Sequence, residues 1–313
     1  MSETTTLENV IEQVYRQSDN HYDEVIPVQE MKFDSIERMW VSGKQVEVIP
    51  SAQRLLANRL RAPHSYLARC PAHLQADNLN YWVRQEGKKR DTFFCRFDGD
   101  KLRAVFTERY AALDNMEILS RMLENGFSPS QEVQYRLDEN LLVVKVPEYD
   151  RSFEVRALDK MVPGISFSNS EVGMLAFCIE VYFFRLVCSN GLIAKVKAGA
   201  SRFKHISRKA LDHFPETIAQ TIQASRERRD VFQISVNTPV SNVEATLVSF
   251  NRQFGIGRRE AGLVEMAWAL EPGNTMFSVI NAYTLAAQTP SLTAGEAYRL
   301  EKTAGQILSL VKH

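Results

Sequence analysis

The segment from Met174 to Val187 is the most apolar part of the chain, and it restricts the fold more than any other feature. Glu180 and Arg185 interrupt it, so no run approaches the roughly 18 apolar residues that a membrane-spanning helix needs. Turn-forming residues stand on both sides, and a short apolar run between turns is typical of a strand buried on both faces. The segment therefore predicts the central sheet of a soluble protein that does not span a membrane.

Two hairpins are predicted upstream of this segment. Asp98-Gly99 separates two runs in which apolar residues alternate, and this combination is a strong hairpin signal. The residues from Asp138 to Asn140 supply a second turn, between apolar runs on either side. Six side chains of the first hairpin are expected to face one core, namely Phe93, Cys95, Phe97, Leu102, Ala104 and Phe106.

Helices are predicted from capping patterns and periodicity. Thr293 and Glu296 have the spacing of a capping box, and Asp114 is placed to cap another helix. Helical periodicity also dominates the chain beyond residue 201. The polar segment 18–24 is predicted to be a loop.

Together these patterns predict an α+β protein with a helical N-terminal part, a central antiparallel-rich β-sheet with hairpins, and a helical C-terminal third. The predicted segments are 1–92, helical and extended; 93–200, the β-rich core; and 201–313, the C-terminal helical region. The alternative is one integrated domain from about residue 27 onward. With 313 residues the chain is long enough for either arrangement.

The charges of the chain balance, but they are unevenly distributed. Lys and Arg number 38, as do Asp and Glu, which excludes a generally basic nucleic-acid-binding chain. Residues 195–209 nevertheless contain six cations and no acid, and the small residues among them would let a phosphate backbone approach closely. The alternative is a solvated loop and helix start. The predicted nucleic-acid contacts in this stretch, with Phe203 as a stacking face, are Lys195, Lys197, Arg202, Phe203, Lys204, His205, Arg208 and Lys209.

A second group of cations belongs to the first hairpin. Arg96 and Arg103 alternate with the expected core positions, so they are predicted to lie on the exposed face of the hairpin. A sheet face that carries cations beside aromatic residues suits a single nucleic-acid strand. The alternative is an outer sheet face with cross-strand charge pairs.

The sequence contains no motif of the common NTPases, dinucleotide-binding enzymes, zinc proteases or serine hydrolases. We therefore expect no cofactor and no metal site, and a non-enzymatic protein is favoured. The polar constellation within the apolar centre is Glu171, Asn190 and His205, which would serve an alternative metal-dependent enzyme acting on nucleic acids or nucleotides. The four cysteines form no C-x-x-C pair and are predicted to be reduced thiols in a cytoplasmic protein.

Five segments form a recognisable set. They are Phe94–Asn115, Gly164–Gly173, Phe184–Ile193, Phe277–Ala287 and Arg299–Gly305. With this set the chain resembles the phage/plasmid-like protein family, a catalogued domain of unknown function from phages, plasmids and integrated elements. The likeness covers nearly the whole chain from about residue 40, although Phe277 stands where the family pattern has Trp.

The resemblance implies a mobile-element accessory protein and brings no established activity with it. Combined with the basic stretch, it leads to a first hypothesis: a non-catalytic protein that binds single-stranded DNA, either alone or as a homo-oligomer, and supports recombination, annealing or replication. The second hypothesis is the enzyme around Glu171. The third is an assembly or inhibitor protein that binds another protein through its C-terminal helices.

Overall fold

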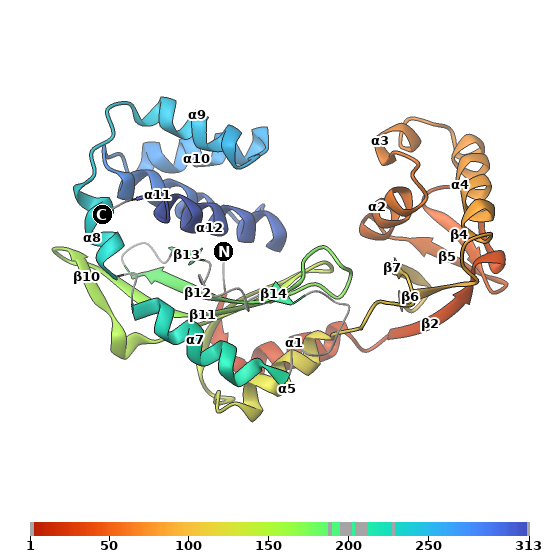
Figure 1. The fold of residues 1–313 in the computed structure, drawn as a ribbon, viewed down its shortest axis with the longest axis horizontal. Helices are drawn as coiled ribbons and strands as arrows, with labels where there is room; N and C mark the ends of the chain where they lie inside the picture. The colour runs from red at the N-terminus through yellow and green to blue at the C-terminus, as the bar shows by residue number, and fades with distance from the viewer. Residues whose placement is uncertain (1–2, 187–189, 195–201, 204–211, 227–228, 312–313) are drawn as a thin grey trace.

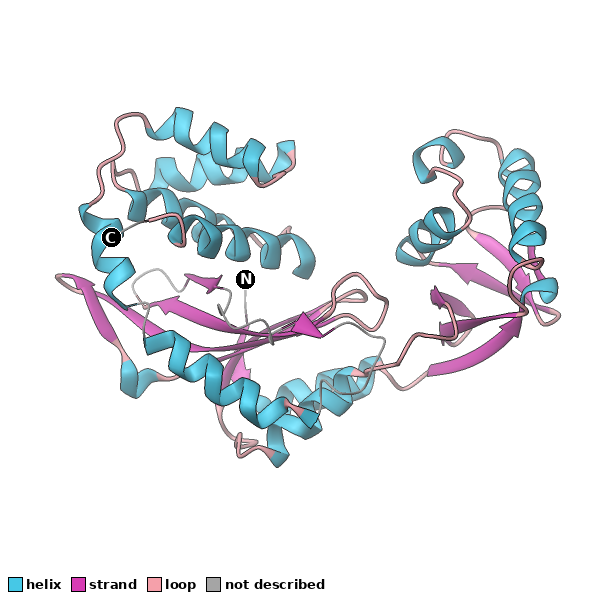
Figure 2. Ribbon diagram, in the orientation of Figure 1, coloured by secondary structure: helices cyan, strands magenta, loops and turns pink. Residues whose placement is uncertain are grey.

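The molecule consists of two lobes, each built around its own β-sheet (Figure 1). The computed structural model describes residues 3–186, 190–194, 202–203, 212–226 and 229–311. The smaller lobe holds a six-stranded sheet and the larger lobe an eight-stranded sheet, and Figure 2 shows how helices accompany each of them. Two connections, residues 18–20 and 107–114, carry the chain between the lobes.

The large sheet is antiparallel throughout its described strands. All nine residues of β12 are buried, which confirms the prediction that the apolar segment supplies a central strand. The strand order is β1 (Glu3–Thr6), β8 (Glu132–Leu137), β9 (Leu142–Pro147), β11 (Asp159–Asn169), β12 (Phe177–Arg185) and β13 (Asn190–Ala194), with β10 (Phe153–Arg156) on β11 and β14 (Arg202–Phe203) on β12.

Helices cover both faces of this sheet (Figure 1). One face packs against α1 (Leu7–Gln17), α5 (Asn115–Glu124) and α7 (Phe214–Arg226). The other face packs against α12 (Ala294–Leu308), on which α11 (Met276–Ala286), α10 (Arg258–Leu270) and α9 (Val243–Gln253) are stacked. Another described helix of this lobe, α8 (Arg229–Asn237), packs against β10.

The smaller lobe has helices on one face of its sheet (Figure 2). These are α2 (Pro50–Arg59), α3 (His64–Leu67) and α4 (Ala72–Glu86). The strands β5 and β7 are parallel and the other neighbours antiparallel. The strand order is β2 (His21–Pro27), β6 (Thr92–Asp98), β7 (Lys101–Phe106), β5 (Lys44–Val48), β4 (Arg38–Val41) and β3 (Met31–Phe33), and short 3-10 helices span Val28–Glu30 and Tyr149–Arg151.

The predicted mixture of helices and antiparallel-rich sheet is confirmed, as is the helical C-terminal third. Both predicted hairpins form, but the first one belongs to the smaller sheet and not to the central one, because β6 pairs with β2. The loop predicted over residues 18–24 is confirmed for residues 18–20 and wrong for 21–24, since β2 begins at His21. As an edge strand with one mainly exposed face, β2 lacks the apolar alternation by which strands are recognised.

A β-bulge changes which side chains of the first hairpin face the helices. The pairing shifts at Arg103, so that Arg96 lies opposite Ala104 and Phe97 opposite Leu102. Leu102 and Val105 therefore join the core beneath the helices, whereas Ala104 and Phe106 point to the other face. The expectation of one shared face is wrong for the last two, because an inserted residue reverses the alternation beyond it.

None of the described helices is both long and apolar enough to cross a lipid bilayer.

Candidate nucleic-acid interface

The basic stretch 195–209 lies in the sequence between β13, at one edge of the large sheet, and α7. The strand β13 ends at Ala194, and α7 begins at Phe214. Between them, the backbone of Arg202 and Phe203 pairs with Cys178 and Phe177 of β12, at the end of that strand next to the loop 170–174 (Figure 1). The other predicted contacts, Lys195, Lys197, Lys204, His205, Arg208 and Lys209, lie outside the described residues.

The structure buries both arginines that the sequence places on an exposed face. Arg96 is 3% exposed and Arg103 is 5% exposed. They lie on the side of the small sheet opposite its helices, as the alternation predicts, but this side is covered by the loop 170–174 from the larger lobe. The predicted exposure is therefore wrong, because the covering residue Glu171 lies 68 positions beyond Arg103 in the sequence.

Arg96 joins three segments of the chain. Its Nη1 donates to the Glu171 carbonyl oxygen at 3.1 Å, and its Nε donates to Asp23 Oδ1 at 2.9 Å. Its Nη2 pairs with Asp114, the residue that caps α5. Burial alone would lower the pKa of Arg96, but Asp114, Asp23 and Glu171 outweigh it and raise that pKa above its usual range.

Both carboxylate oxygens of Glu171 are bonded. Arg103 Nη2 donates to Oε2 at 2.8 Å, and the backbone N–H of Asn115 donates to Oε1 at 2.8 Å. The Tyr110 hydroxyl donates to the Glu171 carbonyl oxygen at 3.0 Å. Burial alone would raise the pKa of Glu171, but the charge and hydrogen bond of Arg103 and the Asn115 N–H lower it on balance. The Glu171 carboxylate is therefore ionised and links the two lobes.

His21 lies beside Arg103 and Glu171, and its imidazole is neutral. Its Nδ1 lies 2.9 Å from Arg103 Nη1 and 3.7 Å from Glu171 Oε2. A guanidinium can only donate hydrogen bonds, so the imidazole nitrogen accepts one and carries no proton there. Burial, followed by the charge of Arg103, lowers the pKa of His21.

Apolar contacts accompany these ion pairs. Val172 is fully buried and packs in one cluster with Ala104 and Phe106 of the small lobe. The next residue, Gly173, has a φ of +74°, and a Cβ there would lie 2.6 Å from the Phe106 ring. Glycine is therefore required for the loop to reach this position. We name the loop 170–174, together with Arg96 and Arg103, the interlobe clasp.

The residues of the alternative catalytic constellation do not form a described site. Asn190 pairs with Arg185 at the far end of β12, about 26 Å from its first residue at the usual rise of a strand. Only the backbone of Asn190 is described, and His205 lies outside the described residues. Among the described side chains, no group of three His, Cys, Asp or Glu residues could hold a metal ion.

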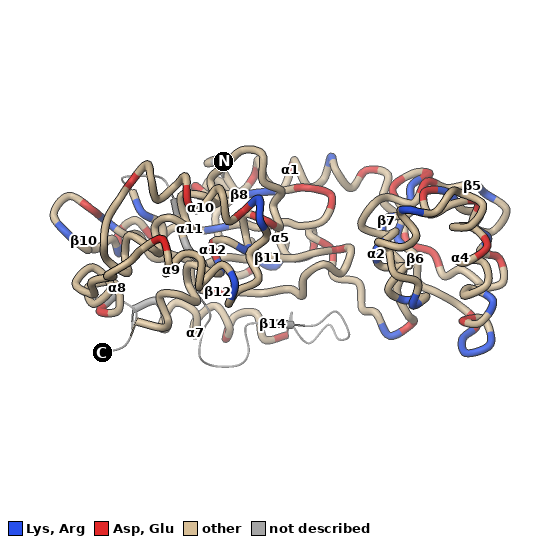
Figure 3. The backbone as a smooth tube through the Cα atoms, turned by 90° about the horizontal axis from the view of Figure 1, so that it is seen from above, with Lys and Arg blue, Asp and Glu red and all other residues tan. Residues whose placement is uncertain are grey.

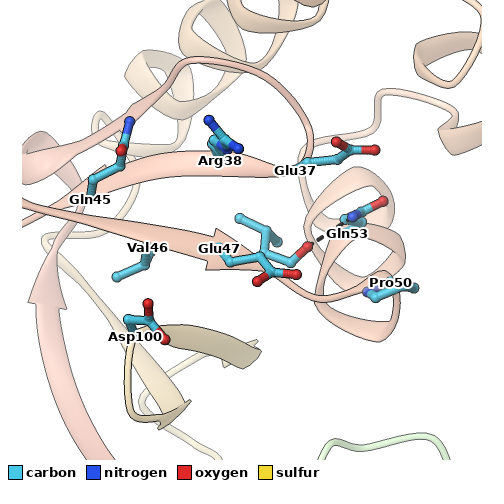
Figure 4. Close-up of a pocket in the computed structure, with 9 residues that line it drawn as sticks. Glu37, Arg38, Gln45, Val46, Glu47, Pro50, Gln53 and Asp100 are labelled. Atoms are coloured by element: carbon cyan, nitrogen blue, oxygen red, sulfur yellow. Dashed lines mark hydrogen bonds between the residues drawn. The ribbon is translucent and has the colours of Figure 1, made fainter.

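A hollow of about 580 Å³ lies in the smaller lobe, between β4, β5, the start of α2 and the β6–β7 turn (Figure 4). Carboxylates of Glu37, Glu47 and Asp100 line it, with Arg38 as the cation. Its lining is thus mainly acidic, and like charges repel phosphate. This hollow does not suit a nucleic-acid backbone.

A buried ion pair in the larger lobe was not predicted from the sequence. Lys145 of β9 and Glu301 of α12 are each 1% exposed, and they contact each other directly. A neighbouring pair joins Lys302 Nζ to Glu180 Oε1 at 2.9 Å. The signal in the sequence was Lys145, a single lysine within an otherwise apolar strand. A charge at a buried position requires a partner, so this lysine indicated an ion pair.

One family model matches the chain. It describes a domain of unknown function (DUF932), and it covers residues 103–247. The matched range begins in β7 of the smaller lobe, contains the clasp loop and most strands of the large sheet, and ends within α9. The resemblance to a domain of unknown function is thereby confirmed over this range. No curated protein and no solved structure matches the chain.

Proposed function

We propose that this protein binds single-stranded DNA without catalysing a reaction, as a cytoplasmic accessory protein of a phage or plasmid in recombination, annealing or replication. The observation that carries the proposal is the acid-free stretch 195–209, with six cations in a chain of zero net charge. The stretch also lies inside the range that the family model matches.

Physical chemistry connects this stretch to a polyanion. Cations that neutralise phosphates release condensed counterions, so they contribute binding energy that depends on salt but not on sequence. An aromatic ring among them, here Phe203, offers a surface for stacking a base. Arg96 and Arg103 do not support the proposal, because their guanidinium groups are occupied within the clasp.

The test is the fluorescence anisotropy of a labelled oligo(dT) over a series of salt concentrations. Six neutralised phosphates predict a slope of about −4 in a plot of log K against log salt. The variant Lys204→Glu/Arg208→Glu reverses two of the charges and is expected to weaken binding at least about tenfold and to flatten the slope. A wild-type protein that shows no salt-sensitive binding would refute the proposal.

The matched control is Arg252→Glu/Arg258→Glu, which reverses two exposed charges at the turn between α9 and α10. It changes the net charge equally, and we expect affinity within about twofold of the wild type, since these exposed charges are not among the proposed contacts and are screened by salt. Native mass spectrometry in the same buffers measures the proposed homo-oligomer. Cleavage of the oligonucleotide on addition of Mg²⁺ would favour the alternative enzyme. Capture of a protein partner that is equally strong in the wild type and in both variants would favour the alternative assembly or inhibitor protein.

A further inference from the structure

A row of exposed side chains runs along α4 on the surface of the smaller lobe. Leu74, Tyr81 and Lys88 are seven residues apart, so they lie nearly in line along one side of the helix and its C-terminal turn. Leu74 is 42% exposed and Tyr81 is 50% exposed. The opposite side of α4 packs in the core of the smaller lobe, so Leu74 and Tyr81 lie on its solvent side.

Tyr81 lies between an aromatic neighbour and cations. The Trp82 ring, 37% exposed, contacts the Tyr81 ring edge to face with centroids 5.2 Å apart. Arg84 is exposed one turn beyond Tyr81, and Lys88 Nζ is held by Gln85 Oε1 at 3.0 Å. We name Leu74, Tyr81, Trp82, Arg84 and Lys88 the α4 stripe.

The helical layer that carries this stripe is strongly basic. Residues 50–90 contain eight Lys or Arg and two acidic residues, an excess of six positive charges. One acid, Glu86, is paired with Lys89 and Arg90, and the other, Asp77, is exposed on α4. In Figure 3, Lys and Arg positions of the backbone lie near α4 in the smaller lobe, away from the larger lobe. The cations exposed in this layer outside the Glu86 pairs are Arg54, Arg61, Arg69, Arg84 and Lys88.

We propose that the α4 stripe binds a segment of single-stranded nucleic acid, with bases stacked on Tyr81 and Trp82 and phosphates paired with Arg84 and Lys88. The proposal rests on the proposed function. It adds a second contact surface, on the smaller lobe, to the contacts proposed for the stretch 195–209. Exposed rings beside cations form the combination that binds single strands, since every base offers a stacking face and every nucleotide a phosphate. A duplex hides its base faces, so the surface selects single strands.

The excess of positive charge distinguishes this occupant from a protein partner. The centre of a surface that docks another protein is usually depleted of charged residues other than Arg, and Lys is among the depleted types. Here Arg84 and Lys88 stand beside Tyr81, within a layer of one predominant sign. Charge complementarity therefore favours a polyanion.

The first experiment compares Tyr81→Ala with Tyr81→Phe. The probe is a fluorescein-labelled oligo(dT) of about 20 nucleotides, longer than the ~4–16 that one binding fold covers. We expect Tyr81→Ala to weaken binding about five- to hundredfold, as the loss of one stacked base does, and Tyr81→Phe to bind within about twofold of the wild type. The matched control is Tyr15→Ala, which removes a 62% exposed aromatic ring from α1 in the larger lobe.

The second experiment uses the indole of Trp82 as a local reporter. Stacking of a base on Trp82 is expected to quench its fluorescence, and Trp82→Phe should remove that quenching while keeping most of the affinity. Trp40 and Trp268 complete the three tryptophans of the chain and remain in this variant as the background signal. Arg84→Glu is expected to weaken binding and reduce its salt dependence, because one phosphate contact is lost.

The outcomes separate this inference from the function on which it rests. Wild-type protein that binds no oligonucleotide overturns both. Binding that falls with Lys204→Glu/Arg208→Glu but is unchanged in Tyr81→Ala and Arg84→Glu overturns the α4 stripe alone. A Tyr81→Ala protein that changes its native mass while keeping its affinity for oligo(dT) also overturns it, in favour of a protein contact.

Discussion

The two lobes bury their sheets in different ways. The large sheet is covered on both faces by helices of its own lobe, which use α1, α5 and α7 on one side and α12 on the other. The described helices of the small sheet lie on one face, and the other face is closed near Arg96 and Arg103 by a loop that belongs to the larger lobe. The larger lobe thus covers both faces of its own sheet, whereas one face of the small sheet is covered by a loop of the larger lobe.

The buried charges follow the same division. In the larger lobe, Lys145 is neutralised by Glu301, and Arg185 Nε donates to Asp159 Oδ1 at 2.8 Å, all within the lobe. In the clasp, Arg103 is neutralised by Glu171 across the boundary between the lobes. Loss of a partner should therefore unfold the larger lobe in the first case and loosen the attachment of the lobes in the second.

The largest effect is expected for Lys145→Ala. Removal of one partner leaves the Glu301 carboxylate buried without a cation, which costs about 3–5 kcal/mol of unfolding free energy. Urea denaturation followed by circular dichroism measures the loss. The double variant Lys145→Met/Glu301→Leu removes both charges and should recover most of that stability. A single variant as stable as the wild type would show that the pair does not support the sheet.

The next effect in size is expected for Glu171→Gln. Arg103 then lacks its anionic partner, so the interlobe clasp should weaken by about 1.5–3 kcal/mol, the range for a hydrogen bond to a charged group. Because each lobe keeps its own core, the helical signal should be retained while trypsin cleaves faster after Arg109, an exposed residue of the connection 107–114. The variant Glu124→Gln, on an exposed ion pair of α5, is the control. Cooperative loss of all structure at once would contradict a division into separable lobes.

Local patterns predicted much of each lobe, because they depend on neighbouring residues. The turn of the second hairpin forms as expected, with Asp138 Oδ1 accepting hydrogen bonds from the backbone N–H groups of Asn140 and Leu141. Thr293 and Glu296 form the predicted capping box. Asp114 caps α5 by position, but its carboxylate pairs with Arg96 and makes no capping hydrogen bond.

The clasp could not be predicted in the same way. Alternation placed Arg96 and Arg103 on the correct side of the hairpin, but alternation says only which side, not what covers it. The cover comes from a loop between two strands of the other sheet, and the bulge at Arg103 brings Phe106 to the same side as Val172. The cover depends on contacts between distant residues, and the bulge depends on how two strands pair, so the periodicity of a single strand records neither.

The smallest effect concerns the pH dependence of the clasp. In the closed clasp, burial and the charge of Arg103 lower the pKa of His21. Below about pH 6.5 the imidazole therefore binds fewer protons in the closed clasp than in an open form, in which the loop 170–174 has left Arg103. The clasp should therefore weaken as the pH falls through the range below 6.5. The lowered pKa of Glu171 acts in the same direction only at lower pH, below about 4.5, where the open form begins to take up a proton.

The Asn115 amide reports this opening, because its N–H donates to Glu171 Oε1 in the closed clasp. Hydrogen exchange at Asn115, corrected for the intrinsic pH dependence of exchange, should be faster at about pH 5.5 than at about pH 7.5. His21→Gln keeps an acceptor for Arg103 but does not titrate, so it should abolish that difference while Glu171 still responds at lower pH. Exchange that slows on acidification would mean that the imidazole is protonated in the closed clasp, and the assignment of His21 as an acceptor would then be wrong.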